Sequence, residues 1–248
     1  GIENTFVGYY SGSSNLAGER SVAVGGYALS SNTIGSRNIA IGHGALQSNV
    51  DGSYSVAIGY AALNAQDPAA PVNMYNVAIG HNAGAAVTTG TQNALVGGNA
   101  GDALTTGYRN AVLGHNALGT ETTGAASVAI GYHALRFQDT AAYNYNIAIG
   151  AEAGQAITTG DSNTLIGGLA GDALTTGGRN VAIGLGALGG EDATGRVVAI
   201  GYGALAAQNT PNNSYNVAIG YQASSALTIG AENTIVGSFA GDAILSGA

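Results

Sequence analysis

Residues 167–184 read GGLAGDALTTGGRNVAIG, and variants of this stretch fill the chain. Its last five residues, NVAIG, form a phrase of one Asn or Ser, three mostly apolar residues and a closing glycine. The phrase occurs fourteen times, with Val197 the single exception to the Asn or Ser. The closing glycines are 17 residues apart except at three places, where the interval is 21, 19 and 19 residues. A fixed short period indicates stacked copies of one structural unit, here called a rung.

Each rung has the features of a short strand between tight corners. Val181 and Ile183 share one face and Ala182 takes the other, since side chains alternate along a strand. We expect the Val/Ile face to fill the interior and the Ala face to lie outside. A second glycine follows ten residues after most closing glycines, which predicts two corners with positive φ and two short strands per rung. The sequence therefore predicts an all-β fold, a parallel β-roll or β-solenoid of about 14 rungs.

Two columns of the repeat are expected to be structural. One holds the closing glycines, among them Gly80, Gly97, Gly114, Gly131, Gly150, Gly167 and Gly184. The other holds the Asn that opens the phrase, as in Asn76, Asn146 and Asn216, and stacked Asn side chains can form a hydrogen-bonded ladder.

A longer period lies over the first, because every fourth rung carries extra residues in the same place, at 66–75, 138–145 and 208–215. We expect one repetitive domain, 1–248, with superrepeats at about 4–75, 76–145 and 146–215 and a partial one at 216–248. The extra residues should project from one edge of the stack. Fourteen rungs at ~4.8 Å predict a rod of about 67 Å. Both ends fall inside the repeat, so we expect a segment of a longer fibre or an end-to-end stack.

The composition argues against several partners and chemistries. The net charge is -8 and the six basic residues are all Arg, which disfavours nucleic acid and anionic membranes. No apolar run is long enough for membrane insertion. Cys is absent, so there is no thiolate metal site or disulfide. The glycine-rich strings lack the Lys of a phosphate loop.

No catalytic, metal or cofactor site stands out, so we expect no enzyme. Asp102, Asp172 and Asp242 share one slot but are four rungs apart, about 19 Å, too far for a carboxylate pair. The position after the closing glycine holds His in some rungs and Tyr in others. An amphipathic corner explains this better than a metal site formed by a ring of three histidines in a trimer. The histidines there are His43, His81 and His115.

Two sets of residues are candidates for ligand contact. The first set stands in or beside the longer rungs: Gln66, Asp67, Tyr75, Gln138, Asp139, Tyr143, Tyr145, Gln208, Asn209 and Tyr215. Aromatic rings beside amide and carboxylate groups suit carbohydrate or protein recognition, and a purely structural loop is the alternative. The second set lies just before the Asn or Ser of the phrase: Arg20, Arg37, Arg109, Arg179 and Arg196. These arginines would either pair with acidic residues or form a row that contacts sugar or sulfate.

The phrase, as in residues 55–59 (SVAIG) and 127–131 (SVAIG), resembles the head repeats of trimeric autotransporter adhesins (YadA-like) along the whole chain. Those heads are left-handed parallel β-rolls. The 17-residue rung is longer than theirs and, with NTLIG at 163–167 and TTG at 175–177, is similar to repeats of phage tail fibres and bacterial surface proteins. The resemblance implies a trimeric extracellular fibre on a cell surface or virion, and it names no ligand.

Three functional hypotheses follow. The first is a non-catalytic structural or adhesive fibre segment, a homotrimer that also contacts a host surface protein or glycan. The second is a single-chain solenoid that polymerises head to tail into an extracellular filament. The third, an ice-binding solenoid, needs a regular Thr array, and the Thr pairs are interrupted, for example by NVDG at 49–52.

Overall fold

A computed structural model describes residues 1–141, 143–190, 193 and 195–247. The chain divides into two compact units, Gly1–Ala125 and Ala126–Ala248. Both are built from short strands joined by turns and bends. In the described part of the chain, no helix is long and apolar enough to cross a lipid bilayer.

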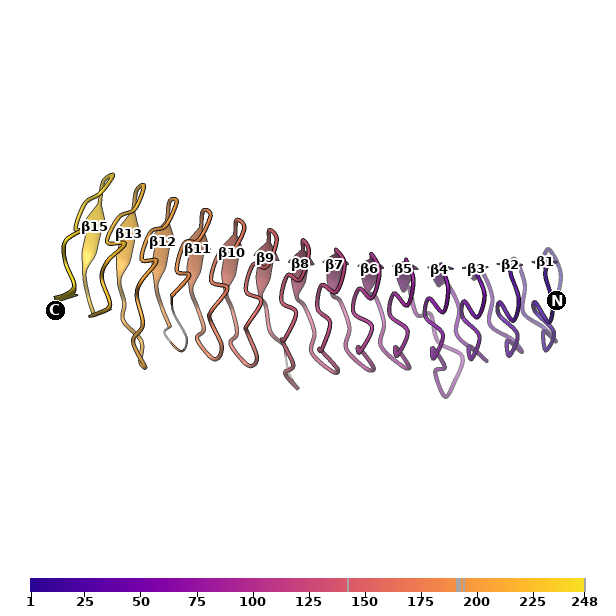
Figure 1. Cartoon of the computed structure of the whole chain (residues 1–248). Helices are drawn as coiled ribbons and strands as arrows, with labels where there is room; N and C mark the ends of the chain where they lie inside the picture. Colours follow the sequence, from indigo (N-terminus) through magenta and orange to yellow (C-terminus); the bar gives the residue numbers. More distant parts are fainter. Residues whose placement is uncertain (142, 191–192, 194, 248) are drawn as a thin grey trace. The chain divides into compact units, whose positions relative to one another are not determined.

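The first unit is a parallel β-solenoid in which each strand pairs with the next one along the chain (Figure 1). Its strands are β1 (Thr5–Val7), β2 (Val22–Val24), β3 (Ile39–Ile41), β4 (Val56–Ile58), β5 (Val77–Ile79), β6 (Ala94–Val96) and β7 (Ala111–Leu113). The register is in phase, so that Val22 lies opposite Ile39 and, across the longer interval, Val56 lies opposite Val77. The predicted parallel stacking at 17-residue spacing is confirmed.

The second unit has the same architecture. Its strands are β8 (Val128–Ile130), β9 (Ile147–Ile149), β10 (Thr164–Ile166), β11 (Val181–Ile183), β12 (Val198–Ile200), β13 (Val217–Ile219) and β15 (Thr234–Val236). A separate small sheet pairs β14 (Ile229–Gly230) with β16 (Ser246–Gly247). Most described rungs therefore contain one strand followed by turns, and the expectation of two strands per rung is wrong for them.

The interior is lined by the middle residue of each strand, which reverses the expected orientation. Ala182 is fully buried, while Val181 and Ile183 on either side of it stay partly exposed. The same alternation holds along both units, so the Val/Ile columns face outward. The physical reason is the width of the rung. Where the opposite wall contributes a large buried side chain, such as Leu188, the strand carries Ala; where glycines face the strand, Leu165 takes the same buried place.

The two glycine columns have different causes. At Gly150, φ is +141°, and a Cβ there would lie 2.4 Å from the carbonyl oxygen of Gly167 in the next rung. The predicted positive φ is confirmed throughout this column. Gly160, in the second column, has no positive φ, so that part of the prediction is wrong. Glycine is required there because a Cβ would approach the carbonyl oxygen of Gly177 to 2.2 Å.

The predicted asparagine ladder is confirmed inside each unit. Asn146 is buried and donates through Nδ2 to the carbonyl oxygen of Gly160, at 2.7 Å. Its Oδ1 accepts from the backbone N–H of Asn163 in the next rung, at 2.9 Å. Asn76 and Asn216 make the equivalent pairs of bonds. The ladder satisfies buried backbone groups at the corner, which explains the Asn in this column.

Candidate binding surface

The glutamines of the longer rungs lie in the interior and are not ligand contacts. Gln66 is fully buried; its Nε2 donates to Asn49 Oδ1 at 2.9 Å, and its Oε1 accepts from Asn76 Nδ2 at 3.0 Å. Gln138 and Gln208 are buried in the same way and accept from the ladder asparagines at 2.7 and 3.1 Å. These three residues join the internal polar column, so their prediction as binding residues is wrong.

The residues that follow these glutamines are exposed. Asp67, Asp139 and Asn209 occupy equivalent places, and the backbone N–H of each donates to a Thr carbonyl oxygen of the next rung, at 2.9–3.1 Å. The chain then forms a loop that reaches beyond the regular rungs of its own unit (Figure 1). In the second unit, residues 210–214 and 229–231 border a groove of about 360 Å³. The predicted projection of the extra residues is confirmed within each unit.

Three of the tyrosines lie in the same column as the arginines. Tyr75, Tyr145 and Tyr215 each precede the ladder Asn directly, as the five arginines precede the Asn, Ser or Val of their own rungs. We call this set the Arg–Tyr column. It comprises Glu3, Arg20, Arg37, Tyr54, Tyr75, Gln92 and Arg109 in the first unit, and Ala126, Tyr145, Ser162, Arg179, Arg196, Tyr215 and Glu232 in the second. Every member has φ between +50° and +63°, so the side chains leave equivalent points of successive rungs.

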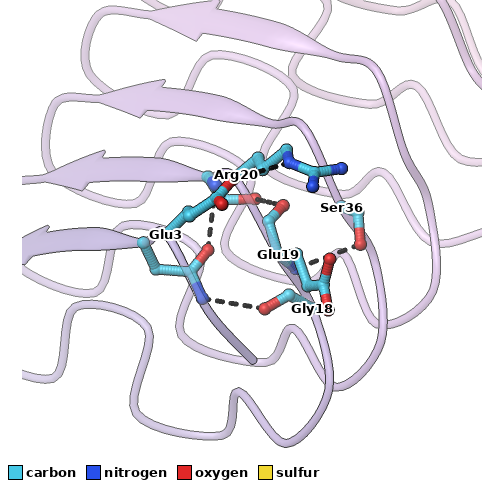
Figure 2. A network of polar contacts seen from close by, with 7 residues as sticks. Glu3, Gly18, Glu19, Arg20 and Ser36 are labelled. Atoms are coloured by element: carbon cyan, nitrogen blue, oxygen red, sulfur yellow. Dashed lines mark hydrogen bonds and ion pairs between the residues drawn. The ribbon is translucent and has the colours of Figure 1, made fainter.

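All seven members in the first unit are exposed, and side-chain contacts join four of the six neighbouring pairs along the stack. Arg20 Nε donates to Glu3 Oε2 at 2.7 Å (Figure 2), and this bond raises the pKa of the guanidinium. Figure 2 also shows the backbone N–H of Glu19 bonded to Ser36 Oγ of the next rung, at 3.1 Å. The predicted pairing of arginine with an acidic residue is therefore confirmed for Arg20.

Farther along this column, the contacts involve planar groups. The Arg37 guanidinium lies 5.1 Å from the centre of the Tyr54 ring, and the Tyr54 and Tyr75 rings are 5.3 Å apart. Arg109 Nε donates to Gln92 Oε1 at 3.0 Å. Within the described residues, no carboxylate is within ion-pair distance of Arg37 or Arg109. The column thus offers guanidinium groups that internal ion pairs do not neutralise.

The second unit repeats part of this arrangement. The Arg196 guanidinium is 5.5 Å from the centre of the Tyr215 ring, and Arg196 Nη1 donates to the Tyr215 hydroxyl at 3.4 Å. Tyr145 stacks on Tyr143 with ring centres 5.4 Å apart and planes at 8°. Tyr143 is thus the one member of the tyrosine set that lies in the loop itself.

A second exposed column follows the closing glycines. His43, Tyr60 and His81 stack with ring centres 5.6 and 5.2 Å apart and planes at 12° in both pairs. His115 occupies the same slot two rungs beyond His81, with Gly98 between them. Among the residues that the structure describes, no group of three or more His, Asp or Glu side chains is arranged to hold a metal ion.

Comparison of the chain with protein families, with curated proteins and with solved structures gives no match. The resemblance to adhesin heads and tail fibres therefore remains a prediction from the sequence.

Proposed function

We propose that this chain is a non-catalytic segment of an extracellular fibre, carried on a cell surface or a virion, and that it assembles as a parallel homotrimer. The observation that supports this proposal most directly is the outward face of the strands. Two columns of aliphatic side chains run along it in each unit, one on either side of the buried alanines.

These side chains remain accessible although each is covered by its neighbours in the rungs before and after. Ile39, Ile41 and Ile79 keep 37–39% of their surface exposed. Contiguous apolar patches of this kind usually mark an interaction site, because leaving them in water forfeits about 25 cal/mol for every Å². A flat, repetitive face is best covered by an equally repetitive partner, and another copy of this chain is one.

The outward face also favours the trimer over the head-to-tail filament. A filament of single chains would join the end strands of successive copies and leave the Val/Ile columns in water. A parallel trimer covers these columns along their length and leaves the Arg–Tyr column and the loops as candidates for adhesion. The proposal thus keeps the predicted oligomer and replaces its predicted Ala interface with the Val/Ile face.

The test is the mass in solution of the chain and of two variants. We expect three times the chain mass of 24.2 kDa by light scattering. The double variant Ile41→Glu/Ile79→Glu puts charges on the outward face and should give monomers. The control Leu16→Glu changes a residue that is 75% exposed and lies outside the strands, and should leave the mass unchanged. A monomeric parent would contradict the trimer, and an open series of masses would favour the filament.

A further inference from the structure

We propose that the Arg–Tyr column of the first unit, from Arg37 to Arg109, binds a linear anionic polysaccharide through hydrogen bonds and charge. This inference rests on the proposed role of the chain as an adhesive fibre and names the class of ligand that the fibre would hold.

In the described part of the chain, the column carries guanidinium groups that are not paired with carboxylates. Acidic residues outnumber arginines by 14 to 6 in the chain, so each arginine has carboxylates available, yet Arg37 and Arg109 form an ion pair with none in the described residues. The acids between them in sequence, Asp51, Asp67 and Asp102, lie in other columns. Asp51 instead accepts from Thr33 Oγ1 at 3.0 Å. Exposed guanidinium groups of this kind suit sulfate and carboxylate, which they bind in a bidentate manner.

The contacts of the Tyr54 ring disfavour a neutral sugar that binds by stacking. The faces of Tyr54 are turned toward its neighbours, with the Arg37 guanidinium at 5.1 Å and the Tyr75 ring at 5.3 Å. A neutral sugar that binds by stacking needs an open aromatic face. Tyr54 is contacted on both sides, so what it offers to a ligand is its hydroxyl group, beside the N–H groups of the Arg37 guanidinium. The column therefore favours a ligand recognised by hydrogen bonds and charge over one recognised by stacking.

The spacing of the two arginines suits a linear polymer. Arg37 and Arg109 are four rung intervals apart, about 19 Å, with Tyr54, Tyr75 and Gln92 between them. A linear polymer with regularly spaced anionic groups can contact both arginines at once, and simultaneous weak contacts add by avidity. The Arg196–Tyr215 contact shows that the second unit presents the same pairing of guanidinium and phenol.

The experiment measures binding of three probes of equal length to the intact chain by calorimetry: a sulfated heparin oligosaccharide, an oligogalacturonate and a neutral dextran oligomer. The variants are Arg37→Gln, Arg109→Gln and the double variant. Gln fits this position, since Gln92 occupies the same column with φ of +61°. Arg136→Gln is the control, because it removes the same charge from a different column.

We expect binding of at least one anionic probe, a loss of about three- to fivefold for each single variant and about tenfold or more for the double variant. Binding should weaken at higher salt, and Arg136→Gln should bind as the parent does. The stronger of the two anionic probes identifies sulfate or carboxylate as the favoured group. Equal binding of dextran, parent-like binding of the double variant, or binding of no probe would overturn the inference.

The mass measurement keeps this inference separate from the proposed assembly. A trimer that binds none of the probes refutes the glycan site alone. A monomer whose anionic-glycan binding is lost in the double variant refutes the trimer alone.

Discussion

The replacement of Gly150 by Ala tests whether the closing corner limits how closely the rungs stack. Gly150 has φ of +141°, and a Cβ there would lie 2.4 Å from the carbonyl oxygen and 2.5 Å from the carbonyl carbon of Gly167. Both atoms belong to the backbone of the next rung. Relief of the contact therefore requires the two rungs to separate or the corner to change its conformation.

The expected cost has two parts. A non-glycine residue at positive φ costs roughly 1–2 kcal/mol. Separation of the two rungs weakens the bond from Gly167 N–H to the carbonyl oxygen of Ile149, and a changed corner weakens the bond from Gly150 N–H to the carbonyl oxygen of Ile130; both bonds are 2.8 Å long. At roughly 0.5–1.5 kcal/mol for each bond, the total loss is about 2–5 kcal/mol.

Gly186→Ala is the matched control in the same unit. Gly186 has φ of +62°, but a Cβ there would meet nothing within 4 Å. Ala61 occupies the equivalent place in another rung with φ of +52°, so Ala is compatible with this corner. We expect a loss of at most about 1–2 kcal/mol for the control, since only the conformational cost remains.

The assay is urea denaturation of both variants and the parent, followed by circular dichroism at one protein concentration. The reasoning is refuted if Gly150→Ala is no less stable than Gly186→Ala, because the close approach of the two rungs would then have no energetic consequence.

The remaining predictions concern the polar ladder, a half-buried carboxylate and the core. Asn163→Leu should lower the free energy of unfolding by about 2–4 kcal/mol, measured by urea denaturation, because it leaves the buried carbonyl of Gly177 and the N–H of Asn180 without a partner; parent-like stability would contradict the ladder. Partial burial raises the pKa of the Asp102 carboxyl above its usual 3.8. The free energy of unfolding therefore falls as the pH rises from 3.8 through the higher pKa of the folded state. Asp102→Asn should therefore raise the thermal midpoint at pH 7 but not at pH 3, and an equal effect at both would contradict the assignment. Leu95→Ala should cost about 2–4 kcal/mol in calorimetry, since this side chain is fully buried, and a loss below about 1 kcal/mol would mean that the core closes around the gap.

The fold could be predicted because the period is strict. Seventeen residues from one closing glycine to the next bring equivalent residues into register, and Val181 lies opposite Val198 as the repeat requires. The closing glycines could be assigned for the same reason, because a tight corner repeated in every rung needs the same backbone conformation each time. The number of strands per rung could not be predicted, since backbone hydrogen bonds between turns hold most rungs together where a second strand was expected.

The candidate site could be predicted in part. The errors are explained by the position of each residue within its rung, counted from the closing glycine. Gln66 stands seven residues after its closing glycine, as Asn49 does, and this equivalence places both in the interior column. Gln66 was assigned to the predicted loop because the extra residues of the longer rung follow it directly. Tyr75 precedes the ladder Asn as Arg109 does, so the same count places the tyrosines and the arginines in one column from the amino-acid sequence alone.

The reversed faces of the strand have a more general cause. Alternation shows that Val181 and Ile183 lie opposite Ala182, but it does not say which side is enclosed. Hydrophobicity alone favours burial of the larger Val and Ile side chains, whereas the width of the rung decides which face of the strand is enclosed. Leu188, on the segment that closes the rung, takes up interior volume and the strand there carries Ala, whereas Leu165 is buried in the same strand position where glycines face it. The larger aliphatic side chains are therefore left outside, and because a single chain cannot cover them, the same geometry that overturns the predicted interior gives the trimer its proposed interface.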